Sequence, residues 1–235
     1  MTTRRSVLAA ALAVFVCMTS ATAIHAEPLS ARRVPGGDGN TYMPLETGAR
    51  WSYFRTIDDG EGTVREGGDV VMTVTGREKF KLNDAGDYTP EYSVVSVSDD
   101  TALPRKMYFL LEDGVLTQYG QPMFDFNAAQ GETLNMGGFD RHEGSEFFGT
   151  STTTTYLGAE QVDVPAGTFK NCRKYRLERI SFTMNDTVGG AKTTGSVGYF
   201  WFARGVGIVR MVFSDSRDDV SGHVHTLDLA SYSIP

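Results

Sequence analysis

The side chains best suited to chemistry in this sequence are three histidines, His142, His223 and His225. His223 and His225 are two residues apart in an alternating segment, so in a β-strand both imidazoles would point to one face and could meet one metal ion. Leu227 and Leu229 share that face, which directs the pair towards the interior. Two ligands are too few for a metal centre, and only His142 or a distant acid could complete it. The pair is a candidate metal site, and an ordinary pair of strand histidines is the favoured interpretation.

Motifs for nucleophilic catalysis or phosphate binding are not recognisable in the sequence. The nearest approach to a serine nucleophile elbow, residues 194–198, lacks the first glycine of Gly-x-Ser-x-Gly. Cys172 lies in an alternating apolar stretch, where a buried, inert thiol is more frequent than a nucleophile. Residues 140–143, Asp-Arg-His-Glu, lie in a glycine-rich region and are interpreted as a solvated loop. We therefore predict a protein that is not an enzyme and needs no cofactor.

Any site must be positioned by short segments in which apolar and polar residues alternate. Turns that contain Gly, Asp and Asn separate these segments. No window of a dozen residues has a 3.6-residue period, so helices should be few and short. Many closely spaced strands without intervening helices predict a mainly β fold: an antiparallel meander that forms a strongly curved sheet or half-barrel. The predicted strands are residues 50–57, 69–75, 91–98, 106–112, 115–119, 151–157, 171–183, 196–203, 207–214 and 223–232. A tight turn at Asp113-Gly114 is predicted to join 106–112 to 115–119.

Two turn motifs have more distinctive sequences than the segments around them. In residues 164–169, VPAGTF, Pro165 presets the first turn dihedral and Gly167 can take the positive φ that closes the turn, which predicts a bulged hairpin. In residues 199–209, YFWFARGVGIV, an aromatic strand should reverse at Gly205 and Gly207 and leave as an apolar strand. These four turn residues are predicted to be structural.

Acidic runs fall between the predicted strands, at residues 58–61, 83–87 and 215–219. None has the ligand spacing of a known calcium loop. Asp and Asn favour turns, so the runs are interpreted as solvated hairpin tips.

The N-terminus has the three parts of a secretion signal. Arg4 and Arg5 precede an apolar core over residues 7–18, and small residues offer cleavage sites near Ala26. The core is short for a bilayer-spanning helix, which needs about 20 residues. We predict a signal peptide at residues 1–26, a flexible Pro- and Gly-containing linker at 27–41, and a single β-rich domain at 42–235.

The route of export is left open by the paired arginines. General secretion is favoured over the twin-arginine pathway because the core is strongly apolar. A lipid anchor on Cys17 is disfavoured, since the residues before it are not small. The expected location is the periplasm or the extracellular space, and no transmembrane segment is expected in the mature chain.

Composition limits the partners. The 235 residues carry a formal net charge of −7, which suits neither nucleic acid nor an anionic membrane surface. Removal of the leader would leave Cys172 as the one cysteine, so an intramolecular disulfide is excluded in the mature chain.

The sequence from Tyr42 to Tyr232 resembles an uncharacterised family of exported bacterial proteins. The resemblance is carried by a Tyr-x-Pro-Leu, Gly, Trp-x-Tyr opening over residues 42–53, the VPAGTF turn, and the Trp-Phe-Ala-x-Gly-Val-Gly closing element at 201–207. Many members of the family look like lipoproteins, and this chain departs from them at Cys17. The resemblance implies no catalytic residues.

Aromatic side chains are abundant in the predicted strands, and a curved sheet must have its concave face filled, covered or used. Trp51, Tyr53, Tyr199 and Trp201 are the candidates for contacting an apolar ligand such as a lipid or acyl chain. The predicted function is that of an exported, non-enzymatic β domain that binds such a ligand. Alternatives are an ordinary aromatic core in an envelope structural or protein-interaction module, and a metal-dependent hydrolase that uses His223 and His225.

Overall fold

The computed structural model describes residues 41–79, 90–99, 102–143, 146–185, 190–215 and 223–235. The predicted signal peptide, and all of the predicted linker except Thr41, lie outside these ranges. The described residues form twelve β-strands with no α-helix among them. In this part of the chain, therefore, no helix could cross a membrane.

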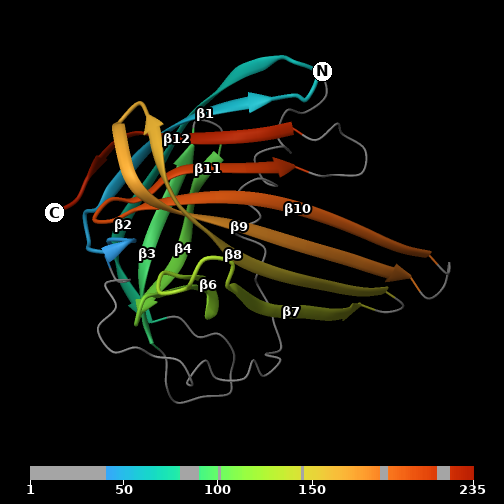
Figure 1. Ribbon diagram of the computed structural model, residues 1–235. Coiled ribbons are helices and arrows are strands. Elements are labelled where there is room, and N and C mark those ends of the chain that lie inside the picture. The colour runs from blue at the N-terminus through green and yellow to red at the C-terminus, as the bar shows by residue number, and fades with distance from the viewer. Residues whose placement is uncertain (1–40, 80–89, 100–101, 144–145, 186–189, 216–222) are drawn as a thin grey trace.

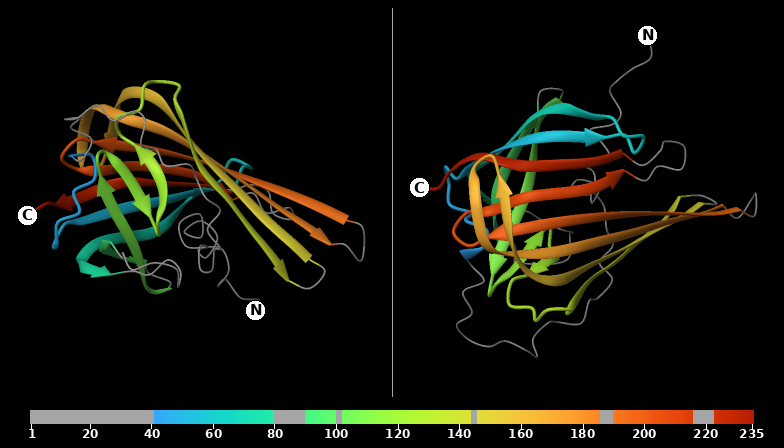
Figure 2. Two further views of the ribbon diagram at one scale, coloured as in Figure 1. Left: turned by 90° about the horizontal axis from the view of Figure 1, so that it is seen from below. Right: turned by 45° about the horizontal axis from the view of Figure 1, so that its top comes forward.

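The strands vary widely in length. They are β1 Arg50–Asp58, β2 Val64–Lys79, β3 Glu91–Asp99, β4 Ala102–Glu112, β5 Val115–Gln118, β6 Gln121–Asp125, β7 Thr133–Glu143, β8 Glu146–Val164, β9 Gly167–Asn185, β10 Gly190–Ala203, β11 Gly207–Asp215 and β12 His223–Ser233. The long strands β8, β9 and β10 extend beyond the short strands β5 and β6 (Figure 2).

All twelve strands join one antiparallel sheet in the order β6-β5-β4-β3-β2-β1-β12-β11-β10-β9-β8-β7. The first and last strands pair with each other, which joins the two halves of the chain (Figure 1). The sheet curls into a nearly closed barrel shape whose edge strands, β6 and β7, lie close together. This confirms the predicted curved antiparallel meander.

Alternation of side chains decides which face of each strand points inwards. Along β1 every second side chain is buried, from Trp51 through Tyr53 and Arg55 to Ile57. On β12 the buried side chains are His225, Leu227 and Leu229. The inner faces of these paired strands are therefore continuous across the junction between the two ends of the chain.

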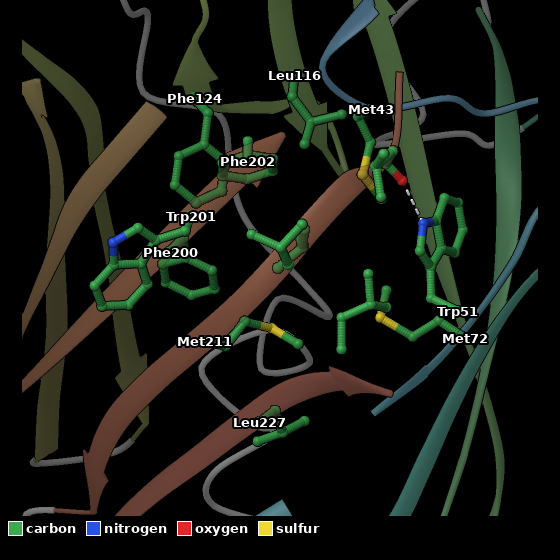
Figure 3. Close-up of a cluster of buried hydrophobic side chains, with 14 of the residues drawn as sticks. Met43, Trp51, Met72, Leu116, Phe124, Phe200, Trp201, Phe202, Met211 and Leu227 are labelled. Carbon is green, nitrogen blue, oxygen red and sulfur yellow. Dashed lines mark hydrogen bonds between the residues drawn. The ribbon is translucent and has the colours of Figure 1, made fainter. Parts of the chain in front are cut away.

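An aromatic core fills the barrel at the end where β10 turns into β11, which we call the packed end. Phe124 lies 4.9 Å from Phe202 and 5.3 Å from Tyr175, measured between ring centroids, with the rings edge to face in both pairs. Figure 3 shows Phe124, Phe200 and Phe202 on one side of this core, with Trp51 and Met72 on the other. Edge-to-face packing of this kind stabilises a core beyond the area it buries.

The predicted turns form at the predicted residues. Asp113 and Gly114 both have positive φ, 49° and 80°, as a two-residue hairpin loop requires. Val164 pairs with Gly167 across the VPAGTF turn, where Gly167 has φ 132°. The predicted bulge lies in the same hairpin, between Glu160 and Val162.

Two strands were not predicted from the sequence. Strand β6 contains Pro122, which lowers strand propensity but is tolerated at the edge of a sheet. Strand β7 includes residues 140–143, so the prediction of a solvated loop there was wrong. Residues 140–143 pair with β8, with Asp140 opposite Gly149. Backbone hydrogen bonds hold such a pair, so the strand does not need alternating apolar and polar side chains.

Candidate functional site

Cross-strand pairing arranges the inner face of six adjacent strands into two rows of buried side chains, in which successive members are register partners. The lower row, nearer the packed end, is Tyr156, Tyr175, Phe200, Met211, Leu227 and Arg55. The upper row is Thr154, Leu177, Gly198, Phe213, His225 and Ile57. Each row crosses β8, β9, β10, β11, β12 and β1 in that order. The two rows form a wall of the concave face, and Tyr175 and Phe200 of the lower row also pack against Phe124 of the aromatic core.

Arg55 places a guanidinium on this otherwise uncharged wall. Its side chain is 5% exposed and donates a hydrogen bond from Nη2 to the carbonyl oxygen of Gly67 on β2. A Cβ at position 67 would lie 2.5 Å from Arg55 Nε, so only glycine leaves room for the guanidinium to lie across the neighbouring strand. Buried charges are stable where hydrogen bonds and opposite charge offset the loss of water.

The two histidines of β12 lie on the inner face, as their spacing predicted. His225 is fully buried, and its ring stacks on Phe213 at 5.3 Å with an interplanar angle of 13°. His223 is half-buried, and its charge contributes to lowering the pKa of Asp59. Among the described side chains, no three His, Cys, Asp or Glu residues gather as metal ligands, and the side chain of His142 is outside that set.

Trp51 and Tyr53 lie inside the barrel at its packed end. The Trp51 indole donates from Nε1 to the carbonyl oxygen of Val206 over 2.5 Å, and the Tyr53 hydroxyl donates to the carbonyl oxygen of Ile208 over 3.0 Å. Both side chains are at most 1% exposed, and burial raises the pKa of Tyr53. These two hydrogen bonds therefore join β1 to the β10–β11 turn and to the start of β11.

Tyr199 and Trp201 lie on the opposite, outer face. Their neighbours Phe200 and Phe202 point into the aromatic core, so alternation turns Tyr199 and Trp201 outwards. The Trp201 indole donates to Glu160 Oε1 over 2.5 Å, and Lys174 Nζ lies 4.8 Å from the Trp201 ring centroid. The structure thus does not bring the four candidate aromatics together: two lie inside the barrel and two outside.

The β8–β9 hairpin folds over the outer face of the sheet and covers part of it. The backbone N–H of Ala166, at the tip of the VPAGTF turn, donates to the carbonyl oxygen of Leu229 on β12 over 2.9 Å. Arg210 on β11 donates to the carbonyl oxygen of Asp163 over 2.9 Å. Cys172 is fully buried in this hairpin, and burial raises the pKa of its thiol to about 11. The thiol is an inert structural group at neutral pH, as the sequence predicted.

A small cavity of about 70 Å³ lies at the seam between β6 and β7. Its lining includes Asp125, Glu132, Thr154, Tyr156 and Tyr175. Ligand pockets for small molecules measure roughly 300–1,000 Å³, so this cavity has room for about two water molecules and not for an organic ligand. The seam is therefore a structural feature and not the candidate site.

The acidic tip at residues 58–61 is the turn between β1 and β2. Asp58 Oδ1 accepts a hydrogen bond from the N–H of Gly60, and Asp59 Oδ1 accepts from those of Glu61 and Thr63, at 2.9 to 3.1 Å. The bonds from Glu61 and Thr63 are the main reason that the pKa of Asp59 is lowered. Here the prediction of a solvated hairpin tip is confirmed. The run at 83–87 and residues 216–219 lie outside the described residues.

Sequence reasoning missed Arg55, although a signal for it was present. In the alternating segment Trp51, Tyr53, Arg55, Ile57, an arginine occupies an inward position between large apolar residues. A charged residue at such a position is rarely buried unless it has a partner. Gly67 gave no comparable signal, because its role depends on which residue of β1 it faces.

No protein-family model and no curated protein matches this sequence. Three solved structures are similar in fold. A Bacteroides fragilis protein with a YmcC-like fold is 14% identical, with a TM-score of 0.43 over 82% of this chain and 99% of its own. A candidate lipoprotein from Parabacteroides distasonis is 14% identical, with a TM-score of 0.48 over 82% and 98%. A LolA superfamily protein from Nitrosomonas europaea is 8% identical, with a TM-score of 0.30 over 84% and 90%. The motif resemblance over Tyr42 to Tyr232 stays a prediction.

Proposed function

We propose that this protein is an exported, non-enzymatic binding module whose concave face holds an apolar ligand, such as a lipid or acyl chain. The ligand would contact the lower and upper rows of the inner face, of which Tyr175 and Phe200 also belong to the aromatic core. The signal peptide predicted at residues 1–26 supports export, and the absence of a recognisable catalytic motif from the sequence supports a binding role.

The observation that carries the proposal is the size of the sheet relative to what fills it. Barrel diameter grows with strand number, and about eight strands already enclose as much space as side chains can fill. Here twelve strands curl around one interior. The described residues include no helix that could occupy this space. A guest molecule is the physical alternative to an interior filled by side chains alone.

The chemistry of the wall suits an apolar chain. The two rows present Phe200, Phe213, Met211, Leu177 and Leu227 inwards. Met is flexible and polarisable, so a wall that contains it can adapt to guests of different shape. Contact with apolar surface contributes about 25 cal/mol per Å² removed from water, which makes an alkyl chain the favoured guest.

A neutral fluorescent probe tests the proposal without involving charge. The uncharged dye N-phenyl-1-naphthylamine should bind the purified protein saturably, with micromolar affinity, and should be displaced by a long-chain alcohol. Phe213→Asp, on the wall, should abolish binding while the circular dichroism spectrum stays that of a β-sheet. Tyr199→Asp is the matched control, since Tyr199 lies on the outer face of the neighbouring strand. Absence of saturable binding to the folded wild-type protein, or equal loss in both variants, would refute the proposal.

An envelope protein-interaction module is the second candidate, and the edge strands favour it. β7 is an eleven-residue strand at one end of the strand order, and an edge of that length can pair with a strand from a partner. Pull-down of envelope proteins that survives Phe213→Asp but not insertion of proline into β7 would favour this function over ligand binding.

A further inference from the structure

We propose that the cavity at the seam between β6 and β7 binds a calcium ion, with the carboxylates of Asp125 and Glu132 as its charged ligands. Both residues line the cavity, Asp125 as the last residue of β6 and Glu132 as the residue before β7. An ion held by both would tie together the two edge strands, which lie at opposite ends of the strand order. This inference goes beyond the proposed apolar ligand and does not depend on it.

The lining of the cavity offers oxygen ligands. Besides the two carboxylates, its polar side chains are the hydroxyl groups of Thr133, Thr154, Tyr156 and Tyr175. Calcium takes about six to eight oxygen ligands from carboxylates, neutral oxygens and water. Among the described residues that line the cavity, none carries a nitrogen or sulfur ligand of the kind that zinc or copper prefers. A volume of about 70 Å³ has room for one calcium ion and a coordinated water.

The Tyr156 hydroxyl is independent evidence for a polar guest in the cavity. The side chain of Tyr156 is only 8% exposed and belongs to the lining. Its ring packs against Tyr175 and against the guanidinium of Arg173, but its hydroxyl makes no hydrogen bond to any described residue. Buried polar groups are nearly always bonded to protein or to ordered water. A water coordinated to the ion would supply the partner of this hydroxyl.

Backbone hydrogen bonds hold the two carboxylates in place. Asp125 Oδ1 accepts from the N–H of Asn127 over 2.8 Å, and Glu132 Oε2 accepts from the N–H of Ala129 over 2.9 Å. A carboxylate has about four acceptor sites, so such a bond does not prevent it from binding an ion. Burial raises the pKa of Tyr175, and the charge of Asp125 adds to this rise, which indicates that the Asp125 carboxylate lies close to the Tyr175 hydroxyl in the lining.

The charges around the cavity set the expected affinity. Arg173 is the nearby basic side chain, and it donates to neutral oxygens: the carbonyl of Ala128 over 2.6 Å and the Tyr175 hydroxyl over 2.9 Å. Two carboxylates and one guanidinium leave a net negative charge. Three His, Cys, Asp or Glu side chains do not gather in the described part of the chain, so neutral oxygens and water must complete the coordination. A site with so few charged ligands should bind calcium with a Kd of roughly 10⁻⁴–10⁻³ M, the range of extracellular calcium modules.

Terbium luminescence measures binding, because Tb³⁺ takes the same oxygen ligands as Ca²⁺ and is excited by energy transfer from nearby tyrosine rings. The protein is treated with EDTA and then dialysed free of the chelator. Tb³⁺ should give a saturable signal that Ca²⁺ displaces. Mg²⁺ should displace it less well, because Mg²⁺ gives up its water reluctantly and requires octahedral geometry. A folded protein that gives no saturable signal, or a signal that Ca²⁺ does not displace, would overturn the inference.

Variants assign the ion to the seam. Asp125→Asn and Glu132→Gln should each weaken Ca²⁺ binding about tenfold or more, since each removes a charge but keeps an acceptor for its backbone N–H. Tyr156→Phe, which keeps the ring, should weaken binding by a smaller factor. Asp59→Asn is the matched control, because Asp59 also accepts backbone N–H bonds in a tight turn but lies at the tip between β1 and β2. Binding that survives both carboxylate substitutions at the seam, or that is lost in the control instead, would overturn the inference.

Hydrogen exchange of the wild-type protein locates the ion without any substitution, and it decides the matter if a variant does not fold. Saturating Ca²⁺ should slow the exchange of amides in residues 121–132 relative to EDTA, because an ion bound to the folded state opposes local opening. Amides of β2 and β3 should exchange at the same rate in both conditions. Calcium binding that leaves residues 121–132 unchanged would place the ion elsewhere and contradict the proposal.

Discussion

The indole Nε1 of Trp51 donates a hydrogen bond of 2.5 Å to the carbonyl oxygen of Val206, a residue 155 positions away in the chain (Figure 3). Gly207, the next residue, approaches the same ring, and the N–H of Gly205 donates to the carbonyl oxygen of Thr41 over 2.7 Å. The opening segment and the β10–β11 turn, which carry two of the motifs noted in the sequence, are thus in direct contact. Their contact closes the packed end of the barrel.

We expect Trp51→Phe to lower the free energy of unfolding by about 1–3 kcal/mol, because the carbonyl of Val206 loses its buried donor. Tyr53→Phe should act in the same direction, since the Tyr53 hydroxyl donates to Ile208. Urea unfolding followed by circular dichroism measures both. Tyr232→Phe, on a side chain that is 44% exposed, is the control and should unfold at the wild-type urea concentration. If the two buried variants also unfold there, these bonds do not stabilise the packed end.

Substitution of the turn glycines by valine should destabilise the fold to different degrees. Gly167, Gly205 and Gly207 have φ values of 132°, 73° and 104°, which a residue with a Cβ adopts at a cost of roughly 1–2 kcal/mol. A Cβ at Gly207 would also lie 3.1 Å from Trp51 Nε1, whereas one at Gly167 or Gly205 meets no atom within 4 Å. Thermal melts should therefore rank Gly207→Val as the least stable. A melting temperature equal to wild type in all three variants would show that these turns are not needed.

The fold was predictable because its information is local. Alternation in residues 50–57, the Asp113-Gly114 turn and the glycines near 205 each fix one strand or one reversal without reference to the rest of the chain. Strand β7 escaped prediction because pairing with β8, and not its own pattern, makes it a strand. The sequence predicted a curved sheet of many strands, but it did not show that twelve strands share that sheet.

The candidate site was less predictable, since it depends on register. Alternation of side chains along a strand shows that Phe200 and Trp201 face opposite sides of the sheet, but it does not show which of them faces inwards. Only the pairing of Phe200 with Met211, and of Met211 with Leu227, places Phe200 on the concave wall and Trp201 outside it. The same holds for Arg55 and His225, which lie 170 positions apart in the chain and become neighbours through the pairing of β1 with β12.

The thiol of Cys172 should resist modification in the folded protein. Burial raises its pKa from 9.0 to about 11, so at pH 8 almost no thiolate is present. In a Cys17→Ser background, iodoacetamide at pH 8 should leave the native protein unmodified, and intact mass should show one adduct after denaturation. Rapid modification of native protein would contradict the burial of this side chain.

The same pKa shift predicts a loss of stability in alkali. The protonated thiol is favoured in the folded state, so its stabilisation is fully present below pH 9 and is lost as the pH rises towards 11. Urea unfolding of the wild-type protein should therefore weaken between pH 9 and pH 11 more steeply than that of Cys172→Ala. Parallel curves would show that the thiol does not contribute.

Acid should release the contact between the β8–β9 hairpin and Trp201. The Trp201 indole N–H, and then the hydrogen bond and charge of Lys174, hold the pKa of Glu160 below its ordinary value. The contact is therefore present above that ordinary value and is lost as the pH falls through the folded pKa. Tryptophan emission should shift to the red in acid, with a transition that Glu160→Gln removes. Glu78→Gln is the control, because Glu78 makes a similar exposed bond to Lys106 away from any tryptophan. An unchanged transition in Glu160→Gln would assign it to another carboxylate.

Side chains of β9 hold the end of β6 and the connection that leads to β7, and residues 131 and 132 of this connection also bond to the backbone of Tyr156 on β8. The Tyr175 hydroxyl donates to the carbonyl oxygen of Asp125 over 2.8 Å. Arg173 donates to the carbonyl oxygen of Ala128 over 2.6 Å while its guanidinium carbon lies 3.7 Å from the ring centroid of Tyr156. Loss of these contacts should free the connection between β6 and β7 without unfolding the sheet.

Hydrogen exchange followed by mass spectrometry tests this expectation. In Tyr175→Phe and in Arg173→Met, amides of residues 121–132 should exchange faster than in the wild-type protein, since the local opening free energy falls. Amides of β2 and β3, which pair with each other on the opposite side of the strand order, should be unaffected. Arg176→Met is the matched control, because Arg176 makes an exposed salt bridge of 2.7 Å to Glu178 and no described bond to the connection. Faster exchange in every strand would mean global destabilisation, and unchanged exchange at 121–132 would mean that the seam closes by other contacts; either result would contradict a side-chain clasp at this edge.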